Sequence, residues 1–245
     1  MNAAVDALLE ARATRRWLTS LPDAPTDMVG AYAIQDAVAR RLGPVVAWKV
    51  GAASPDAEPF RAPINAATVF EGVERLPAAM FQVIGVEAEI AYRMARDLPP
   101  RPTPYTREEV LDAVASVHPA FEIVDTRFAA YGSQPRLSHM ADQTNHGALV
   151  VGPAIADWRR LDPLTERIAL DVDGETKIEV VGGNSGGDAV RLLVWMANEG
   201  ARSFGGLHAG EVVTTGSPIG SVFVQPGSRS VARYGTMGTI ALTVD

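Results

Sequence analysis

Apolar residues near the start of the chain recur at roughly helical spacing. This pattern predicts a helix over residues 2–20. A second helix is predicted from about residue 27 to residue 42, where Thr26 suits the N-cap and Gly43 suits the position after the last turn. Helical spacing then stops, and the residues that follow alternate between apolar and polar. We therefore expect a helical segment over 1–44 and a catalytic domain over 45–245.

Strand-like alternation begins with VVAWKVG (45–51) and is clearest in FQVIGVEAEIAYRM (81–94). In the second stretch one face carries Ile84, Val86, Ala88, Ile90 and Tyr92, and the other carries Gly85, Glu87, Glu89 and Arg93. The residues between the two strands, about 52–71, are rich in Pro and Ala and show little periodicity. They predict a mobile loop that closes over a site as a lid.

From residue 105 onward, the pattern predicts strands with two helices between them. The expected elements are a helix over 105–117 opened by a Thr106–Glu109 capping box, a strand over 119–128, a hairpin turning at Asp173-Gly174, a helix over 186–201 with Asp188 near its start and Gly200 past its end, and short strands from 211 onward. Strict strand–helix–strand alternation is missing. The pattern therefore predicts an α+β fold with a mixed, largely antiparallel, rolled β-sheet.

Composition narrows the classes of function. The formal net charge of the 245 residues is −7, and the arginines are scattered, which argues against nucleic-acid binding. The absence of cysteine excludes thiolate nucleophiles and cysteine-based metal sites. No apolar run approaches the roughly 20 residues of a membrane span, and the first residues lack a signal-peptide core. These features predict a cytoplasmic protein without membrane or nucleic-acid partners.

Lys49 is unusual because the chain has two lysines, Lys49 and Lys177, against twenty arginines. Lysine is a compact charge whose pKa falls readily on burial, so it can exchange a proton where arginine cannot. One interpretation is that Lys49 extends from a strand end into water. The other is that it serves a site.

Glu87 and Glu89 are two residues apart on a strand, so their carboxylates point the same way. A solvated strand face would explain them. Alternatively, a divalent cation would relieve their repulsion, and an all-oxygen ligand set suits magnesium, manganese or calcium. Glu122 on the strand over 119–128 is a candidate third ligand, and Asp125 on the opposite face of that strand is its competitor.

Other motifs are less specific. DVDGET (171–176) lacks most ligand positions of a calcium loop, so a hairpin turn explains it. VGGNSGGDAV (181–190) either cradles an anion or allows close packing of a strand and a helix. His139 and His146 flank the polar stretch MADQTN, and each is either structural or within reach of a substrate.

Six motifs in order, AWKVG, VEAEIAY, FEIVDTR, ADQTNHGALVVG, GGDAVRLLVWMAN and HAGEVVTTGSPIG, resemble the 2-keto-4-pentenoate hydratase family of the fumarylacetoacetate hydrolase superfamily. The resemblance implies a rolled sheet, a Mg²⁺ or Mn²⁺ ion held by Glu87, Glu89 and Glu122, and Lys49 beside the substrate. It also implies a homo-oligomer. Thr215 and Ser217, in the last motif, are expected to bind substrate.

One family feature is missing. Hydratases of this family usually carry an aspartate downstream of the lysine, and the matching stretch APINAATVFEG has none. Glu71, Asp142 and His146 are the candidates to replace it.

The expected activity is hydration of 2-hydroxypenta-2,4-dienoate-type 2-oxo acids in aromatic catabolism. The alternatives are decarboxylation of a 2-oxo diacid of the 4-oxalocrotonate type, hydrolytic carbon–carbon cleavage of an acylpyruvate, and binding of an oxo acid without turnover.

Overall fold

The computed structural model describes residues 2–155 and 157–245, and two β-sheets dominate these residues. The larger sheet has the order β2-β1-β10-β5-β6-β7-β3, with β11 paired to β5, and the smaller has the order β4-β13-β12-β8-β9. The strands are β1 (Val45–Gly51), β2 (Phe60–Asn65), β3 (Val69–Glu71), β4 (Arg75–Leu76), β5 (Gly85–Met94), β6 (Val114–Val124), β7 (His146–Val151), β8 (Arg167–Val172), β9 (Glu175–Val181), β10 (Val212–Thr214), β11 (Val222–Phe223), β12 (Arg229–Tyr234) and β13 (Gly238–Val244).

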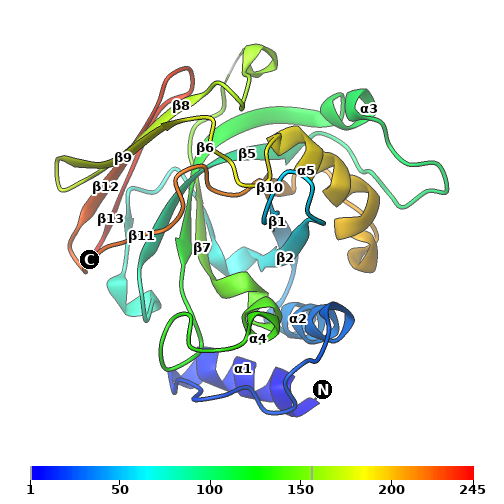
Figure 1. The fold of residues 1–245 in the computed structure, drawn as a ribbon, viewed down its shortest axis with the longest axis vertical. Coiled ribbons are helices and arrows are strands. Elements are labelled where there is room, and N and C mark those ends of the chain that lie inside the picture. The colour runs from blue at the N-terminus through cyan, green and yellow to red at the C-terminus, as the bar shows by residue number, and fades with distance from the viewer. Residues whose placement is uncertain (1, 156) are drawn as a thin grey trace.

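The sheets are mixed and mostly antiparallel, as predicted. Parallel pairing joins β1 to β10, β3 to β7 and β4 to β13, and the other paired strands of the described residues run antiparallel. The larger sheet curls, and the smaller sheet stands beside one end of it (Figure 1). The parallel partners β1 and β10 are far apart in sequence, so the centre of the larger sheet is completed by the last quarter of the chain.

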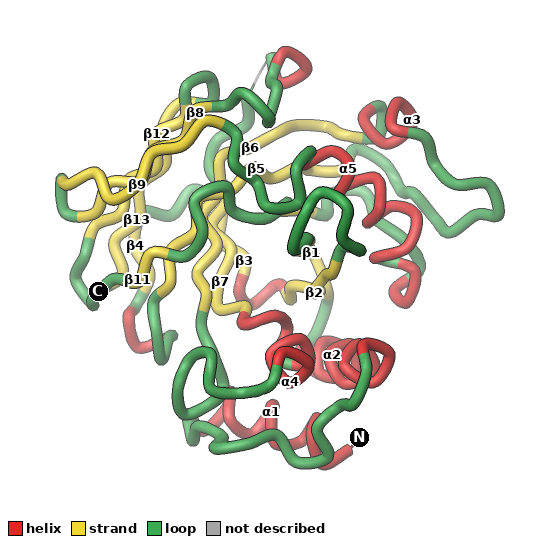
Figure 2. Tube along the Cα trace, in the orientation of Figure 1, coloured by secondary structure: helices red, strands yellow, loops and turns green. Residues whose placement is uncertain are grey.

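The helices gather in two places (Figure 2). They are α1 (Asn2–Thr14), α2 (Met28–Leu42), α3 (Arg107–Leu111), α4 (Arg136–Ala141) and α5 (Ala189–Trp195), which continues as a π-helical turn (Met196–Gly200). Short 3-10 turns occupy Ala66–Thr68, Ala78–Met80, Gln143–Asn145, Trp158–Arg160 and Arg202–Phe204. In Figure 1, α1, α2 and α4 lie together below the larger sheet, and α5 lies at its side. No helix among the described residues is long and apolar enough to span a membrane.

The first helix is shorter than predicted, and the second begins with a different cap. Helix α1 ends at Thr14 because Arg15 has φ 58°, a left-handed conformation that ends the helix. The N-cap of α2 is Asp27, whose carboxylate accepts from the Gly30 N–H, and not Thr26. The helical segment over 1–44 also shares an apolar cluster with Phe128 and Ala141. It therefore packs onto the rest of the chain, and the division at residue 44 stays a prediction.

The helix predicted over 105–117 and the loop predicted over 52–71 were partly wrong. The Thr106 capping box is present, but α3 ends at Leu111 and β6 already begins at Val114. Within the expected loop, β2 pairs with β1 through residues 60–65. Pro63 normally argues against a strand, but β2 is an edge strand of the sheet, where the missing N–H is tolerated. Within 52–71, residues 52–59 are the part that lacks a strand or helix.

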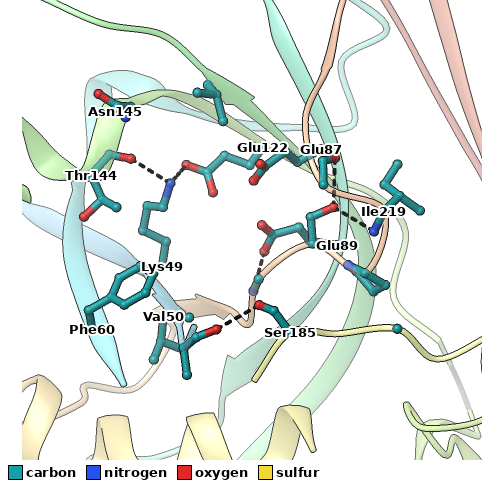
Figure 3. A pocket seen from close by; sticks show the side chains of 18 of the residues that line it. Lys49, Val50, Phe60, Glu87, Glu89, Glu122, Thr144, Asn145, Ser185 and Ile219 are labelled. Atoms are coloured by element: carbon teal, nitrogen blue, oxygen red, sulfur yellow. Dashed lines mark hydrogen bonds and ion pairs between the residues drawn. The ribbon is translucent and has the colours of Figure 1, made fainter. Parts of the chain in front are cut away.

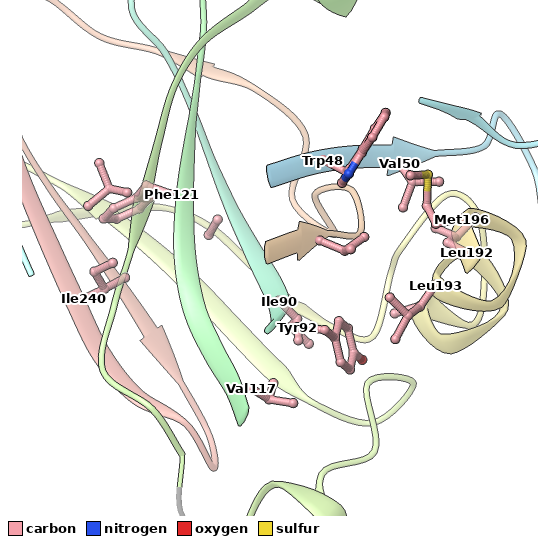
Figure 4. Close-up of a cluster of buried hydrophobic side chains, with 14 of the residues drawn as sticks. Trp48, Val50, Ile90, Tyr92, Val117, Phe121, Leu192, Leu193, Met196 and Ile240 are labelled. Atoms are coloured by element: carbon pink, nitrogen blue, oxygen red, sulfur yellow. The ribbon is translucent and has the colours of Figure 1, made fainter. Parts of the chain in front are cut away.

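The alternation in β5 correctly predicted its buried face. Its apolar residues from Ile84 to Tyr92 are all 5% exposed or less and belong to the main core. Figure 4 shows Ile90 and Tyr92 of this face between Phe121 of β6 and the α5 residues Leu192 and Leu193. The hairpin also forms where predicted, with φ values of 52° at Asp173 and 84° at Gly174 as a type I′ turn requires. The polar face of β5 consequently has a fixed direction.

Candidate active site

The register between β5 and β6 brings three glutamates together. Glu87 lies directly opposite Glu122 in this antiparallel pair, and Glu89 follows two residues later on the same face as Glu87. Residues directly opposite each other in such a pair project to the same side of the sheet. Each glutamate offers a carboxylate oxygen, and these oxygens lie within 4.8 Å of one another. Figure 3 shows the three side chains facing one another in a pocket.

The cluster is not a solvated strand face. Glu89 is 1% exposed and Glu122 is fully buried. The competitor, Asp125, is used elsewhere: its Oδ1 accepts from the backbone N–H groups of Gln82 at 2.9 Å and Val83 at 3.0 Å. Burial of like charges is costly unless a cation compensates them. Of the two carboxylates considered for the third position, only Glu122 lies in the cluster.

Hydrogen bonds hold the glutamates in place but leave one buried carboxylate oxygen, in Glu122, without a partner. Oε2 of Glu89 accepts from the Thr214 hydroxyl and from the Gly216 N–H at 3.0 Å, and Oε1 of Glu87 accepts from Ser221. Oε1 of Glu122 accepts from Lys49, but its Oε2 is buried and has no hydrogen-bond partner. An orphaned carboxylate oxygen beside two other carboxylates is suited to coordinate a cation.

Lys49 lies at the edge of the same cluster. Strand β1 pairs with β10, which pairs with β5, so the ammonium projects toward the glutamates. It donates to Glu122 and to the Thr144 carbonyl at 3.1 Å. An ammonium has three donors, so one remains for a ligand. The interpretation that Lys49 extends into bulk water is wrong, because its side chain is only 13% exposed.

The pKa shifts show an excess of negative charge. Burial, together with the charges of Glu122 and Glu87, raises the pKa of Glu89 well above its ordinary value, and burial with the Glu122 charge raises that of Glu87. Burial would lower the pKa of Lys49, but Glu122 and the other carboxylates outweigh it and raise that pKa. Burial would raise the pKa of Glu122, yet Lys49 and His146 hold it below its ordinary value.

Counted at full ionisation, three carboxylates face one ammonium. A divalent cation would cancel that excess. The donors are all oxygens, and the set fits a hard ion such as Mg²⁺, Mn²⁺ or Ca²⁺.

The cluster forms the floor of a cavity of about 510 Å³. The apolar and aromatic side chains that line the cavity include Phe60, Val124, Tyr131 and Ile219. The Tyr131 side chain lies near Glu87, and burial raises the pKa of its hydroxyl, so the hydroxyl keeps its proton. This volume suits a small organic molecule with one polar end.

None of the three predicted acid–base residues lines the cavity. The Glu71 carboxylate is exposed and pairs with Arg93 at 2.9 Å. Asp142 is fully buried, and its oxygens accept from Arg12 at 3.1 Å and from Arg127 at 2.8 Å. His146 lies behind the cluster: Nδ1 is 3.3 Å from Oε1 of Glu122, and Nε2 is 3.0 Å from the Thr68 hydroxyl. Burial lowers the pKa of His146 and favours its neutral form.

Of the two residues predicted to bind substrate, one lines the cavity and the other does not. Ser217 lines the cavity, with its hydroxyl donating to the Ala88 carbonyl at 3.1 Å. The Thr215 hydroxyl is buried and donates to the Ile90 carbonyl at 3.0 Å, so it is engaged with the sheet. The structure therefore brings Lys49, Glu87, Glu89, Glu122 and Ser217 to one cavity, and leaves Thr215, Glu71, Asp142 and His146 outside its lining.

Sequence reasoning missed several cavity residues. Thr144, Asn145 and Tyr131 reach the cavity from connecting segments, for which no periodic pattern exists. Gly183 and Ser185 belong to the Gly-rich stretch VGGNSGGDAV, which was considered as an anion cradle, and they line the cavity too. Ser185 donates to the Ala52 carbonyl at 2.8 Å, so this stretch closes one wall.

Comparison with known proteins identifies the family of this chain. The family model described as fumarylacetoacetate (FAA) hydrolase C-terminal matches residues 37–245. The 2-keto-4-pentenoate hydratase of Paraburkholderia xenovorans (strain LB400) is 29% identical over 97% of this chain and 92% of its own length. The 2-hydroxyhexa-2,4-dienoate hydratase of Comamonas testosteroni is 31% identical over 64% of this chain and 58% of its own length.

Solved structures share the fold. The 4-oxalocrotonate decarboxylase from Pseudomonas putida G7, complexed with magnesium and adipate, superposes with a TM-score of 0.87 at 20% identity, covering 99% of this chain and 96% of that one. Fumarylpyruvate hydrolase from Pseudomonas aeruginosa, in complex with Mn²⁺ and pyruvate, gives a TM-score of 0.57 at 18% identity, covering 81% and 88% of the two chains. The match of the family model over most of the sequence shows that this chain belongs to the fumarylacetoacetate hydrolase family.

Proposed function

We propose that this protein is a divalent-metal-dependent hydratase that acts on 2-hydroxypenta-2,4-dienoate-type acids in aromatic catabolism. The observation that carries the proposal is the buried cluster of three glutamates with an orphaned oxygen, beside a lysine, at the floor of a cavity with apolar walls. The hydratase relatives that match nearly the whole chain support the reaction type.

Glu87, Glu89 and Glu122 would hold Mg²⁺ or Mn²⁺. When bound, the ion supplies Lewis-acid stabilisation of negative charge on an oxygen of the 2-oxo acid. The protein fixes its ligands in advance, since Thr214, Gly216 and Ser221 already hold two of the carboxylates in place. Such preorganisation avoids a reorganisation cost during the reaction.

Lys49 and Tyr131 are the proton carriers that the cavity offers. Hydration adds water across a carbon–carbon double bond, so one carbon gains a hydroxyl group and its neighbour gains a hydrogen. Lys49 is held by Glu122 and Thr144, and its remaining N–H can donate to the substrate. The protonated Tyr131 hydroxyl can serve as a second donor near Glu87. Together they would do the work expected of the missing aspartate, in place of Glu71 and Asp142. His146 orients Glu122 from behind.

The charge of the cavity favours a monoacid over a diacid. Among the described residues, Lys49 is the one cationic side chain that lines it, and it lies at the carboxylate end. A dicarboxylate of the 4-oxalocrotonate type would bring a second negative charge into the cavity, and the described residues of the lining provide no second cation to compensate it. The lack of a second cation disfavours decarboxylation of a diacid, although a 4-oxalocrotonate decarboxylase is 26% identical over 64% of the chain.

We extend the proposal to the location, the oligomeric state and the partners of the enzyme. We expect a homo-oligomer in the cytoplasm whose partner is a small 2-oxo or 2-hydroxydienoic acid, with no nucleic acid or membrane. The acidic net charge supports the expected absence of a nucleic-acid partner, and a cavity of about 510 Å³ suits a small acid.

The test is a substrate panel with Mg²⁺-loaded protein. The loss of dienol absorbance of 2-hydroxypenta-2,4-dienoate measures hydration, carbon dioxide release from 4-oxalocrotonate measures decarboxylation, and pyruvate release from an acylpyruvate measures carbon–carbon hydrolysis. We expect the first signal, and expect it to disappear with EDTA. Faster turnover of either alternative would contradict the proposal, and no turnover with tight oxo-acid binding would indicate a binding protein.

A further inference from the structure

A second cavity, of about 330 Å³, lies beside α1 and carries the opposite charge. Three arginines line it, namely Arg12, Arg15 and Arg127, against one acidic residue, Asp125. Behind the wall, Asp142 accepts from Arg12 and Arg127. Three guanidinium groups against two carboxylates leave a single positive charge.

Some of the arginine donors have no partner. Nη2 of Arg127 is buried without a hydrogen bond, and so is Nε of Arg12. The Arg127 side chain is only 4% exposed, so it lies too deep to be hydrated as a surface arginine would be. Burial and the neighbouring Arg127 charge lower the pKa of Arg12 to about 10, as expected for crowded cations. A buried donor without an acceptor is uncommon and calls for a ligand.

The rest of the lining is apolar or aromatic. Trp17, Leu42 and Met80 form one side, and the Arg15 guanidinium lies 5.4 Å from the centre of the Trp17 ring. A single positive charge next to apolar walls is complementary to one carboxylate on a short apolar chain. We infer that this cavity is a second binding site for small organic monocarboxylates.

The second cavity shares a wall with the active site. The turn Gln143–Asn145 has three successive residues with positive φ, at 45°, 53° and 60°. Gln143 lines the arginine cavity, whereas Thr144 and Asn145 line the cavity with the glutamates. The Thr144 carbonyl accepts from Lys49.

A second connection runs through Thr68. This residue lines the arginine cavity and bonds to His146, which contacts Glu122. A carboxylate in the arginine cavity is therefore positioned to change the environment of Lys49 and Glu122.

The experiment is isothermal titration calorimetry of the Mg²⁺-loaded protein with pentanoate, with Trp17 fluorescence as a second readout. Arg15→Gln removes one guanidinium from an exposed side chain and is expected to fold. Arg12→Gln removes a second. Lys49→Met is the matched control in the glutamate cavity, and Trp17→Phe shows whether the fluorescence change comes from this site. Neither readout depends on turnover, so a failure here is separate from a failure of the hydratase proposal.

We expect saturable binding in the wild type and in Lys49→Met, with Kd about tenfold weaker in Arg15→Gln, since a charge-assisted hydrogen bond is lost. Trp17→Phe should keep the calorimetric signal and lose the fluorescence change. An unchanged Kd in both arginine variants, or loss of binding in Lys49→Met, would overturn the inference. Sulfate binding as tightly as pentanoate, or pentanol binding as tightly, would overturn the assignment to an organic carboxylate.

Discussion

Asp142 and Glu122 are both fully buried carboxylates, but their surroundings differ. Both oxygens of Asp142 accept hydrogen bonds from Arg127, and Arg12 adds a third partner group. Glu122 has one oxygen bonded to Lys49 and His146 and another with no partner. The charge of Asp142 is therefore compensated by arginines of the protein, whereas Glu122 keeps an oxygen that is available to a bound cation.

The two cavities also differ in charge. The glutamate cavity has three carboxylates and one lysine, and the arginine cavity has an excess of guanidinium groups. Burial of a carboxylate alone therefore does not identify a catalytic residue, since a paired buried carboxylate is part of the scaffold. The useful signal is a buried polar atom whose partners are missing, and each cavity provides at least one.

Replacing Lys49 is expected to have the largest effect. Lys49→Met should reduce kcat by about 1,000-fold because a proton donor beside the substrate is lost. Mg²⁺ affinity should be unchanged or tighter, since an ammonium next to the ligands is removed. Steady-state kinetics and calorimetry measure the two quantities. Lys177→Met, at the other, exposed lysine, is the matched control and should leave both unchanged. Wild-type turnover in Lys49→Met would refute its role.

Removing the charge of Asp142 tests whether this residue stabilises the fold or takes part in catalysis. Asp142→Asn should lower the free energy of unfolding by about 3 kcal/mol, because Arg12 and Arg127 keep their charges and lose their partner. Activity per folded molecule should change less than twofold. Urea unfolding and kinetics normalised to folded protein test this. A large loss of kcat with unchanged stability would restore Asp142 as an acid–base candidate.

Tyr131 should matter less than Lys49. Tyr131→Phe keeps the ring and its packing on Phe223 but removes the hydroxyl. We expect kcat to fall about 100-fold, at the low end for a proton donor, with KM nearly unchanged. Tyr105→Phe, whose hydroxyl donates to Pro99 away from the cavity, is the control. Equal kcat values for the wild type and Tyr131→Phe would leave Lys49 as the proton carrier of the proposal.

The smallest expected effect is a pH dependence of stability in the metal-free protein. Burial and the neighbouring carboxylates raise the pKa of Glu89 in the folded state, so the folded protein binds more protons than the unfolded chain. Stability should therefore fall as pH rises above about 4.5, through the raised pKa, by at most about 1.4 kcal/mol per pH unit.

Comparing Tm of the EDTA-treated wild type and Glu89→Gln across this range isolates the effect. His146, with its lowered pKa, contributes the opposite slope below about 6.5 in both proteins and cancels from the difference. The variant should show the flatter profile. Parallel profiles would mean that the Glu89 carboxylate is not destabilised by its neighbours.

Local patterns predicted the fold where side chains alternate. The two faces of β5 followed from period-two spacing, and the Asp173-Gly174 turn followed from its need for positive φ. The pairing of β1 with β10 has no local signal, because it joins segments far apart in the chain. Pro63 shows the limit of a local rule, since the sheet edge on which it lies is a property of the whole fold.

The same limit applies to the site. Glu87, Glu89 and Glu122 lie on regular strands and could be named as candidate ligands from the residues alone. The scarcity of lysine drew attention to Lys49, and the family resemblance then placed it beside the glutamates. Thr215 and Ser217 belong to one motif, yet only Ser217 lines the cavity. Tyr131, Thr144 and Gly183 reach the cavity from connecting segments whose path depends on tertiary packing. Sequence spacing could not distinguish them from ordinary loop residues.

Calorimetric titration of the metal-free protein with Mn²⁺ tests whether the three glutamates form the metal site. We expect one site in the wild type, with affinity reduced at least about 100-fold in Glu87→Gln, Glu89→Gln and Glu122→Gln, since a charged ligand is lost in each. Glu71→Gln, on the surface, is the matched control and should bind as the wild type does. Unchanged Mn²⁺ affinity in the three cluster variants, with folding intact by circular dichroism, would contradict the assignment of these glutamates as the metal site.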